Sequence, residues 1–186
     1  MGTATIVVLV IAVIAIGVAT YFYLQQRRTQ SLHGRFGPEY ERTVAAIGDR
    51  RRAESELEMR AKRVESYPIR ELSPSEQERF AGAWRVCQSR FVDEPGDAVK
   101  QAHELVNEVM RERGYPVSAE FERNAANLSV DHPRVVEHYR VACDLAARQS
   151  RGQASTEDLR KAMTHYRALF EDLLGVHLAH SEEVKK

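Results

Sequence analysis

The chain opens with a long run of apolar positions that no charged side chain interrupts. The run extends from Ala4 to Leu24 and consists mainly of Val, Ile and Ala. A helix of this length, with a rise of about 1.5 Å per residue, would be roughly 31 Å long and would match a hydrocarbon core of about 30 Å. Its last residues include three aromatic rings, which prefer the headgroup zone of a bilayer: Tyr21, Phe22 and Tyr23. The pattern predicts a transmembrane helix over residues 4–24.

A cleaved signal peptide is the alternative interpretation of this run. A signal peptide carries basic residues before its apolar core, and residues 1–5 contain neither Lys nor Arg. The small residues Gly17 and Ala19 could mark a cleavage site, but bulky aromatic residues follow directly. We therefore expect an anchor that is retained.

The charges that follow the run give it a direction. Residues 25–52 contain seven arginines and three acidic residues, which leaves a net charge of +4, whereas no charged side chain precedes the run. Basic residues stay on the cytoplasmic side of a membrane. The sequence therefore predicts a single-pass protein of the cell membrane with its N-terminus outside and its body in the cytoplasm. Arg27, Arg28 and Arg35 would then contact anionic lipid headgroups, or serve only as topology signals.

A charged helical segment is expected after a basic juxtamembrane segment over residues 25–37. Pro38 stands at the favoured first position of a helix that should extend to residue 66. The apolar stripe of this helix is thin: Tyr40, Val44, Ile47, Leu57, Ala61 and Val64. Arg51 and Glu54 occupy positions where a coiled-coil seam would need apolar side chains. We expect a charged connecting helix over residues 38–66 that forms a solvated strut, with a short coiled coil as the alternative.

Helix-start signals divide residues 73–175 into amphipathic helices. Ser73 offers a capping hydroxyl, Pro74 takes the first helical position and Glu76 completes a capping box. Ser155, with Asp158 three residues later, is a second start of this kind.

Further helices are expected between these two starts. Pro95 should begin one, and a short helix should follow over residues 118–128. Asp131 or Ser129 should cap the next helix, with Pro133 in its first turn. Short loops between such helices favour antiparallel neighbours.

The expected fold class is therefore all-α. It consists of a single N-terminal transmembrane helix, a charged connecting helix and a compact four- to five-helix bundle over residues 73–175. Residues 176–186 are polar and should form a flexible tail. The low numbers of Gly and Pro, 10 and 6, agree with a helical chain.

Charge and motifs narrow the function classes. Residues 53–186 carry 20 basic and 24 acidic side chains, and this acidic body argues against a nucleic-acid binder. The chain has no glycine-rich phosphate loop and no G-x-S-x-G nucleophile motif, so an enzyme is not indicated, although distant residues could still form a catalytic site.

Cys87 and Cys143 lie on apolar helical faces, which favours buried thiols over a disulfide.

Histidines and aromatic residues are the remaining candidates for chemistry. His138-Tyr139-Arg140 and His165-Tyr166-Arg167 occupy equivalent places in two helices, which predicts inward tyrosines with paired hydroxyls and boundary His and Arg. His132 and His138 are six residues apart and would point about 240° apart, so no metal site is expected. A pocket between bundle helices would involve Trp84, His138, Tyr139, His165 and Tyr166.

Three segments resemble a family of bacterial hypothetical proteins with one N-terminal membrane span. These segments read SRFVDEPGDAVKQAHELVNEVMRERGYPV, LSVDHPRVVEHYR and STEDLRKAMTHYRALFEDLL, and the resemblance covers roughly residues 35–175. It implies a bacterial membrane setting and assigns no site residues.

Two functions follow as hypotheses. The first is a membrane-anchored, non-catalytic helical interaction or scaffold module without a cofactor, which holds an unknown protein partner or a second copy of itself at the bilayer. The second is a sensor that binds a small ligand, haem or a metal ion in the bundle pocket.

Overall fold

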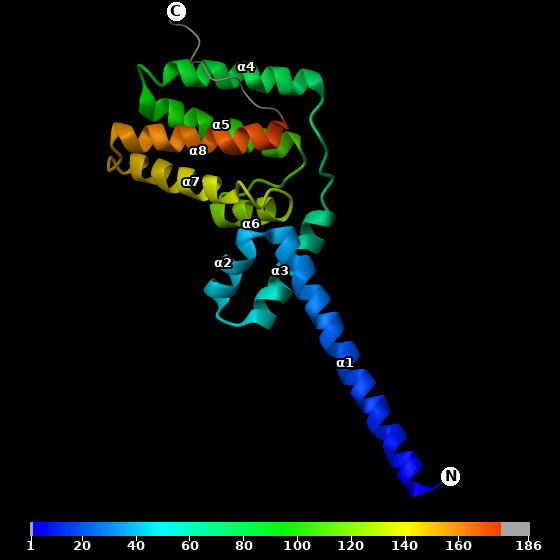
Figure 1. Ribbon diagram of the computed structural model, residues 1–186. Coiled ribbons are helices and arrows are strands. Elements are labelled where there is room, and N and C mark those ends of the chain that lie inside the picture. Colours follow the sequence, from blue (N-terminus) through cyan, green and yellow to red (C-terminus); the bar gives the residue numbers. More distant parts are fainter. Residues whose placement is uncertain (1, 176–186) are drawn as a thin grey trace, which may run out of the picture. The chain divides into compact units, whose positions relative to one another are not determined.

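The computed structural model describes residues 2–175, which contain eight helices and no strand (Figure 1). The all-α class is therefore confirmed for this part of the chain, and the predicted tail over residues 176–186 lies outside it. The chain divides into two compact units between Glu58 and Met59, so the division falls inside a helix.

The first unit begins with the long helix α1 (Thr3–Phe36). Its segment Leu9–Phe36 contains an 18-residue window with a mean hydropathy of 1.7, and α1 is the one helix of the described residues that is long and apolar enough to cross a membrane. A membrane anchor and a signal sequence share these two properties. The predicted juxtamembrane segment is helical up to Phe36 and ends at Gly37, whose φ of 49° favours glycine.

The predicted single helix over residues 38–66 is wrong, because the chain forms two helices there. Helix α2 (Pro38–Ile47) ends at Gly48, whose left-handed backbone (φ 73°) lets its N–H donate to the carbonyl of Val44. Helix α3 (Arg50–Glu65) follows after Asp49, which accepts a hydrogen bond from the backbone N–H of Arg52 at 2.8 Å. The segment is thus no straight strut: α2 packs against α1, and α3 returns toward it (Figure 1).

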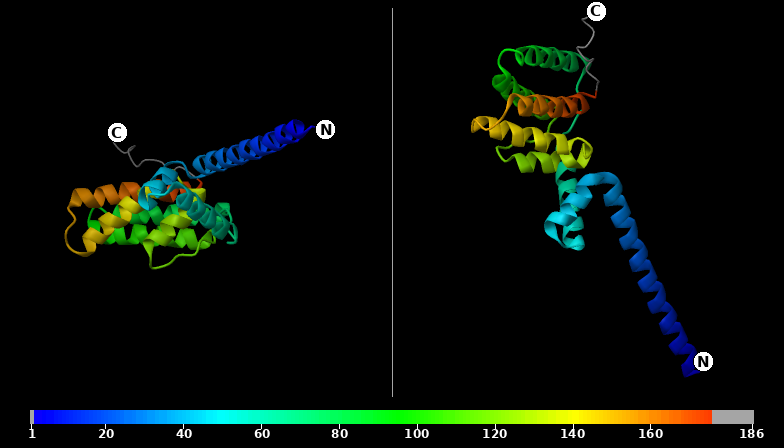
Figure 2. Two further views of the ribbon diagram at one scale, coloured as in Figure 1. Left: turned by 90° about the horizontal axis from the view of Figure 1, so that it is seen from below. Right: turned by 60° about the vertical axis from the view of Figure 1, so that its left-hand side comes forward.

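The second unit is a packed body of five helices that follow the last turns of α3. They are α4 (Pro74–Arg90), α5 (Pro95–Glu112), α6 (Phe121–Asp131), α7 (Val136–Ser150) and α8 (Thr156–Leu174). Helix α8 packs against both α5 and α7, while α4 covers α5 and α6 covers α7 (Figures 1 and 2). The core contains a stacked pair, Trp84 and Phe170, with ring centroids 4.7 Å apart.

The predicted capping boxes at Ser73 and Ser155 are both present. The predicted start of the next helix at Asp131 or Ser129 is wrong, because Ser129 is buried inside α6 and Asp131 is its last residue. The chain leaves the helix at His132, since a residue before a proline is disfavoured in the α conformation. Helix α7 then begins at Val136 without a side-chain cap.

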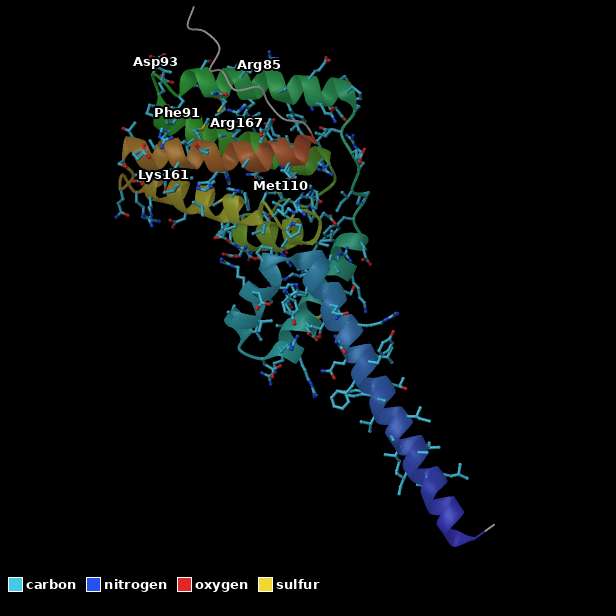
Figure 3. The ribbon with its side chains drawn as sticks, in the orientation of Figure 1. Arg85, Phe91, Asp93, Met110, Lys161 and Arg167 are labelled. Carbon is cyan, nitrogen blue, oxygen red and sulfur yellow. The ribbon has the colours of Figure 1, made fainter. Side chains whose placement is uncertain are left out.

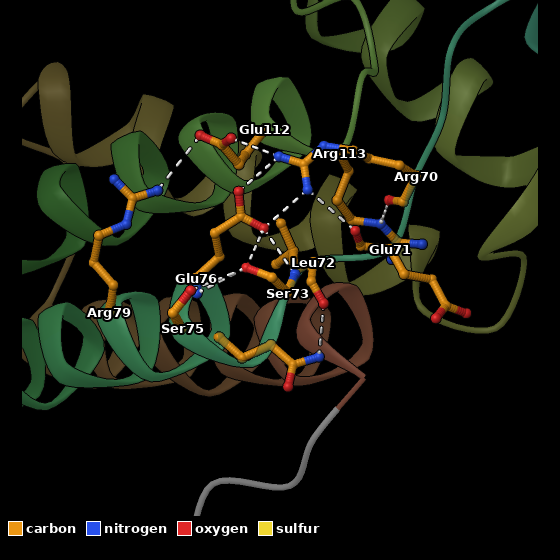
Figure 4. A network of polar contacts seen from close by, with 10 residues as sticks. Arg70, Glu71, Leu72, Ser73, Ser75, Glu76, Arg79, Glu112 and Arg113 are labelled. Carbon is orange, nitrogen blue, oxygen red and sulfur yellow. Dashed lines mark hydrogen bonds and ion pairs between the residues drawn. The ribbon is translucent and has the colours of Figure 1, made fainter.

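A polar network holds the segment before α4 against the end of α5 (Figure 4). Arg70 donates to carboxylate oxygens of Glu76 and Glu112, each at 2.7 Å, and its backbone N–H donates to the carbonyl of Arg113 at 2.9 Å. The pKa of Glu76 is lowered well below its usual range, first by the hydrogen bond from Arg70 and then by bonds from Ser73. This network fixes the entry into the five-helix body.

Candidate functional site

Two of the predicted pocket residues, His138 on α7 and His165 on α8, lie directly against each other. Their Nδ1 atoms are 2.7 Å apart and their ring centroids 5.0 Å apart. One ring must donate its N–H while the other accepts, so the Nδ1 atom of each ring has its partner within the protein. Burial and the neighbouring His138 lower the pKa of His165, and these effects outweigh the opposing charge of Glu137.

The two tyrosines of the repeated pattern lie inside the body, as predicted. Tyr166 forms a hydrogen bond to Nδ1 of His103 at 3.0 Å, and Tyr139 accepts one from Asn124 at 3.5 Å. Burial is the main cause that raises the pKa of both hydroxyls. Both rings are fully buried, so these side chains fill the core and line no open pocket.

His103 on α5 is a member of this buried cluster that sequence patterns did not indicate. Asn107 approaches its Nε2 at 3.0 Å, while Tyr166 and Cys143 lie on its Nδ1 side. Burial lowers the pKa of His103 against the opposing charge of Glu104, and burial raises the pKa of Cys143 to about 11. The cluster is therefore uncharged at neutral pH and contains no activated nucleophile.

Cys143 and Cys87 are both free thiols, so the alternative of a disulfide between them is not formed. Cys87 is fully buried, and its Sγ donates to the carbonyl of Ala98 at 3.1 Å. Burial raises the pKa of this thiol to about 11 as well. Neither cysteine has the thiolate character that reactivity requires.

The stability of the helical body should depend on pH through His103 and His165. Both have a folded-state pKa below the unfolded value of about 6.5, so the unfolded chain binds more protons as the pH falls through that value. The contribution of these two histidines to stability is complete above about pH 6.5 and should decrease as the pH falls below that value.

Urea unfolding of the full chain in mild detergent, followed by fluorescence of Trp84, measures this loss. His165→Gln should flatten the pH dependence, whereas His33→Gln, at an exposed position of α1, should leave it unchanged. If the free energy of unfolding depends on pH equally in the original chain, His165→Gln and His33→Gln, His165 does not cause this dependence.

Trp84, the fifth predicted pocket residue, lies apart from the histidine cluster. It lines a cavity of about 260 Å³ between α4 and α8, together with these residues: Gln88, Phe91, Arg160, Met163, Thr164 and Arg167. Phe91 and Arg167 can be located in Figure 3. The indole Nε1 of Trp84 is buried and has no hydrogen-bond partner. The predicted pocket is thus not one site, because Trp84 faces this cavity while the other four residues pack elsewhere.

His132 lies in a third place and does not join the other histidines. Its Nδ1 forms an ion pair with Asp172, and Arg113 approaches its Nε2 at 3.4 Å. These three residues line a polar cavity of about 310 Å³ beside the end of α8. Within residues 2–175, no three or more His, Cys, Asp or Glu side chains come together in a group that could hold a metal ion.

The first unit contains a buried carboxylate, Glu54, which in the sequence only interrupts the apolar stripe of residues 38–66. Glu54 on α3 is 3 % exposed and accepts hydrogen bonds from Thr29 on α1 (2.7 Å) and Tyr40 on α2 (2.9 Å). Arg50 lies 3.4 Å from the same carboxylate. Burial alone would raise the pKa of Glu54, but these hydrogen bonds and the nearby arginines outweigh it and lower the pKa. One carboxylate therefore joins three helices, and we call this arrangement the Glu54 junction.

No protein-family model, curated protein or solved structure matches this chain.

Replacement of Glu54 by alanine should loosen the Glu54 junction. The change leaves the hydroxyls of Thr29 and Tyr40 without their acceptor, which costs about 1–3 kcal/mol. Amide hydrogen exchange in α2 should therefore become about 10 to 100 times faster, as measured by mass spectrometry on the full chain in detergent. Glu41→Ala removes an exposed carboxylate from α2 and should have little effect. Equal exchange in the two variants would show that Glu54 does not hold the helices together.

Proposed function

We propose that this protein is a single-pass membrane protein whose helical body is a non-catalytic interaction or scaffold module. The observation that carries the proposal is the exposure of α1. Large apolar side chains between Leu9 and Leu24 are exposed on all sides of this helix, and such a surface is compatible with lipid and not with water. The same helix continues without a break into Thr29, which is bound in the Glu54 junction, and this supports a retained anchor over a signal sequence.

We further propose that the N-terminus lies outside the cell membrane and the body in the cytoplasm. The excess of arginine over residues 25–52 supports this direction, and the resemblance described above supports a bacterial membrane. A reporter fused after Lys186 should be active only if it functions in the cytoplasm. Activity of a reporter that works only outside the cytoplasm would overturn the orientation.

A non-catalytic role is supported by the state of the titratable side chains in the body. His103, Cys143 and Tyr166 are held uncharged by burial, and His138 and His165 are bonded to each other. These groups stabilise the packing of α5, α7 and α8. The net charge of −4 over residues 53–186 favours a protein partner, or a second copy of this chain, over nucleic acid.

In-cell photocrosslinking tests the proposal. A benzophenone amino acid is placed at exposed positions on α4, α6 and α8 and in the turn after α4, one position per variant: Val86, Arg123, Lys161 and Val92. We expect at least one position to give a defined crosslinked partner, identified by mass spectrometry, and the crosslink should be lost when residues 2–24 are deleted. The absence of any crosslink, or a crosslink that persists after residues 2–24 are deleted, would contradict the proposal.

The cavity beside Trp84 favours a second candidate function, the binding of a small anionic ligand. Its walls combine the apolar side chains of Trp84, Phe91 and Met163 with two guanidinium groups, Arg160 and Arg167. Apolar walls with a few polar groups are typical of ligand sites. The haem and metal versions of the sensor hypothesis have less support, because His138 and His165 bind each other instead of facing this cavity.

Trp84 is the only tryptophan of the chain, so its fluorescence reports directly on this cavity. The probe is 3-phenylpropionate, and the uncharged 3-phenylpropanol is the matched control. Saturable quenching or a spectral shift of the Trp84 fluorescence by 3-phenylpropionate, but not by 3-phenylpropanol, would support ligand binding. The response should be weaker in Arg167→Gln. The same weak response to both compounds would exclude this class of ligand.

A further inference from the structure

A cavity of about 260 Å³ lies within the first unit, between α1 and α3. It is lined by Tyr21, Leu24, Gln25, Arg28, Arg51 and Glu54. Helix α1 contributes four of these residues and the first turns of α3 contribute two. The cavity therefore exists only because the chain turns at Gly48 and brings α3 back toward α1.

The position of the cavity along α1 corresponds to the boundary between lipid tails and headgroups. Tyr21 belongs to the aromatic group that ends the apolar run, and such rings lie at the headgroup level. Arg28 follows seven residues later, which is about 10 Å further along a helix axis. The wall formed by Tyr21 and Leu24 is thus apolar where acyl chains end, and the wall formed by Arg28 and Arg51 is cationic where lipid phosphates lie.

The charges around the cavity leave an excess of positive charge. Arg28 donates to Glu58 at 2.6 Å, and Arg50 lies beside the carboxylate of Glu54. Both carboxylates are therefore already neutralised, and that of Glu54 also accepts two hydrogen bonds from hydroxyl groups.

Arg51 in the cavity and Arg27, the residue before Arg28, contribute the remaining charge. Arg51 lines the cavity with an exposed side chain, for which residues 2–175 contain no ion-pair partner. Arg27 lies over the ring of Tyr23, 5.0 Å from its centroid. Arg35, which was also predicted to meet lipid, is exposed but does not line the cavity.

We propose that this cavity is a binding site for the phosphate headgroup of an anionic phospholipid. This proposal rests on the membrane anchoring proposed above. The guanidinium of Arg51 binds the phosphate oxygens, since the planar fork of arginine matches phosphate geometry. Arg28, which is paired with Glu58, lies on the opposite wall and keeps that carboxylate from repelling the phosphate, and the amide of Gln25 can donate to the same group. The glycerol and the first acyl carbons lie along Leu24 and Tyr21. The charge of Arg51 in the cavity, with that of Arg27 next to Arg28 along the chain, favours anionic over zwitterionic lipid.

Native mass spectrometry of the full chain in detergent tests the site, with phosphatidylglycerol and phosphatidylcholine added at equal concentration. We expect more phosphatidylglycerol to be bound, and Arg51→Gln should weaken its binding about fivefold, since one basic residue near a lipid surface contributes about 1 kcal/mol. Arg52→Gln is the matched control, because it removes the same charge from the next exposed position of α3 but not from the cavity.

Three results would overturn the proposal. Equal binding of the two lipids would remove the charge selectivity, and equal loss in Arg51→Gln and Arg52→Gln would show that the attraction is diffuse. Loss of bound phosphatidylglycerol in excess inorganic phosphate, at constant ionic strength, would assign the cavity to free phosphate. This experiment needs no cellular membrane, so its failure is distinct from a failure of the anchoring, which cell fractionation measures.

Discussion

Replacement of Val13 and Ile14 together by arginine is expected to release the chain from the membrane. Each arginine near the centre of a spanning helix costs about 2.5–3.5 kcal/mol, so the pair should change the insertion equilibrium by a factor on the order of 10⁴. The two side chains are 68 % and 60 % exposed, so their replacement removes no packing within the protein. Carbonate extraction of cell membranes, followed by immunoblotting, measures the result.

Two further variants separate insertion from other effects of charge. Val13→Leu with Ile14→Leu keeps the apolar surface and should remain in the membrane pellet. Val86→Arg with Val92→Arg adds the same charge to exposed positions of the helical body, and it should also stay in the pellet. If the double arginine variant of α1 resists carbonate extraction as well as the original chain does, α1 is not the anchor.

The second large effect is expected at the stacked pair in the centre of the helical body. Phe170 is fully buried, and its ring stacks on Trp84 at an interplanar angle of 27°. Phe170→Ala should lower the free energy of unfolding by about 3–5 kcal/mol, because the lost transfer energy adds to the cost of the cavity. Urea unfolding of the full chain in detergent gives this value.

The emission of Trp84 gives a second measurement on the same variant. It should shift to longer wavelength once Phe170 no longer covers the indole ring. Val92→Ala, at a position that is 83 % exposed, should change the free energy of unfolding by less than about 0.5 kcal/mol. A similar small change in Phe170→Ala would mean that α4 and α8 do not form a common core.

Local signals in the sequence predicted the body of the fold well, because helix starts depend on neighbours only a few residues away. The capping boxes at Ser73 and Ser155 and the start of α5 at Pro95 are of this kind. The break at Gly48 was missed, since a glycine inside a charged helical pattern is tolerated unless tertiary contacts favour the turn. Here the contact is the hydrogen bond between Tyr40 and Glu54, which are 14 residues apart.

The candidate sites were less predictable, because they depend on how helices are placed around one another. The repeated His-Tyr-Arg pattern correctly indicated that His138 and His165 occupy equivalent places, and the structure brings them together. Trp84 was assigned to the same pocket although it belongs to another pair of helices. Glu54 was seen as a poor seam residue, because nothing in its own segment reveals the hydroxyls that it meets.

The unbroken course of α1 past Leu24 has a mechanical consequence. Twelve residues continue as helix from there to Phe36, and at about 1.5 Å each they extend α1 by roughly 18 Å. If α1 crosses the bilayer as proposed, this part of the helix is a stalk outside the hydrocarbon core. Thr29 of this part of α1 is bound in the Glu54 junction, so α2 and the first turns of α3 are held to the helix and the first unit has no flexible tether after Leu24. One residue inserted after Leu24 would turn the rest of α1 and the Glu54 junction by about 100° around the helix axis relative to the apolar segment, so register becomes as important as length within the first unit.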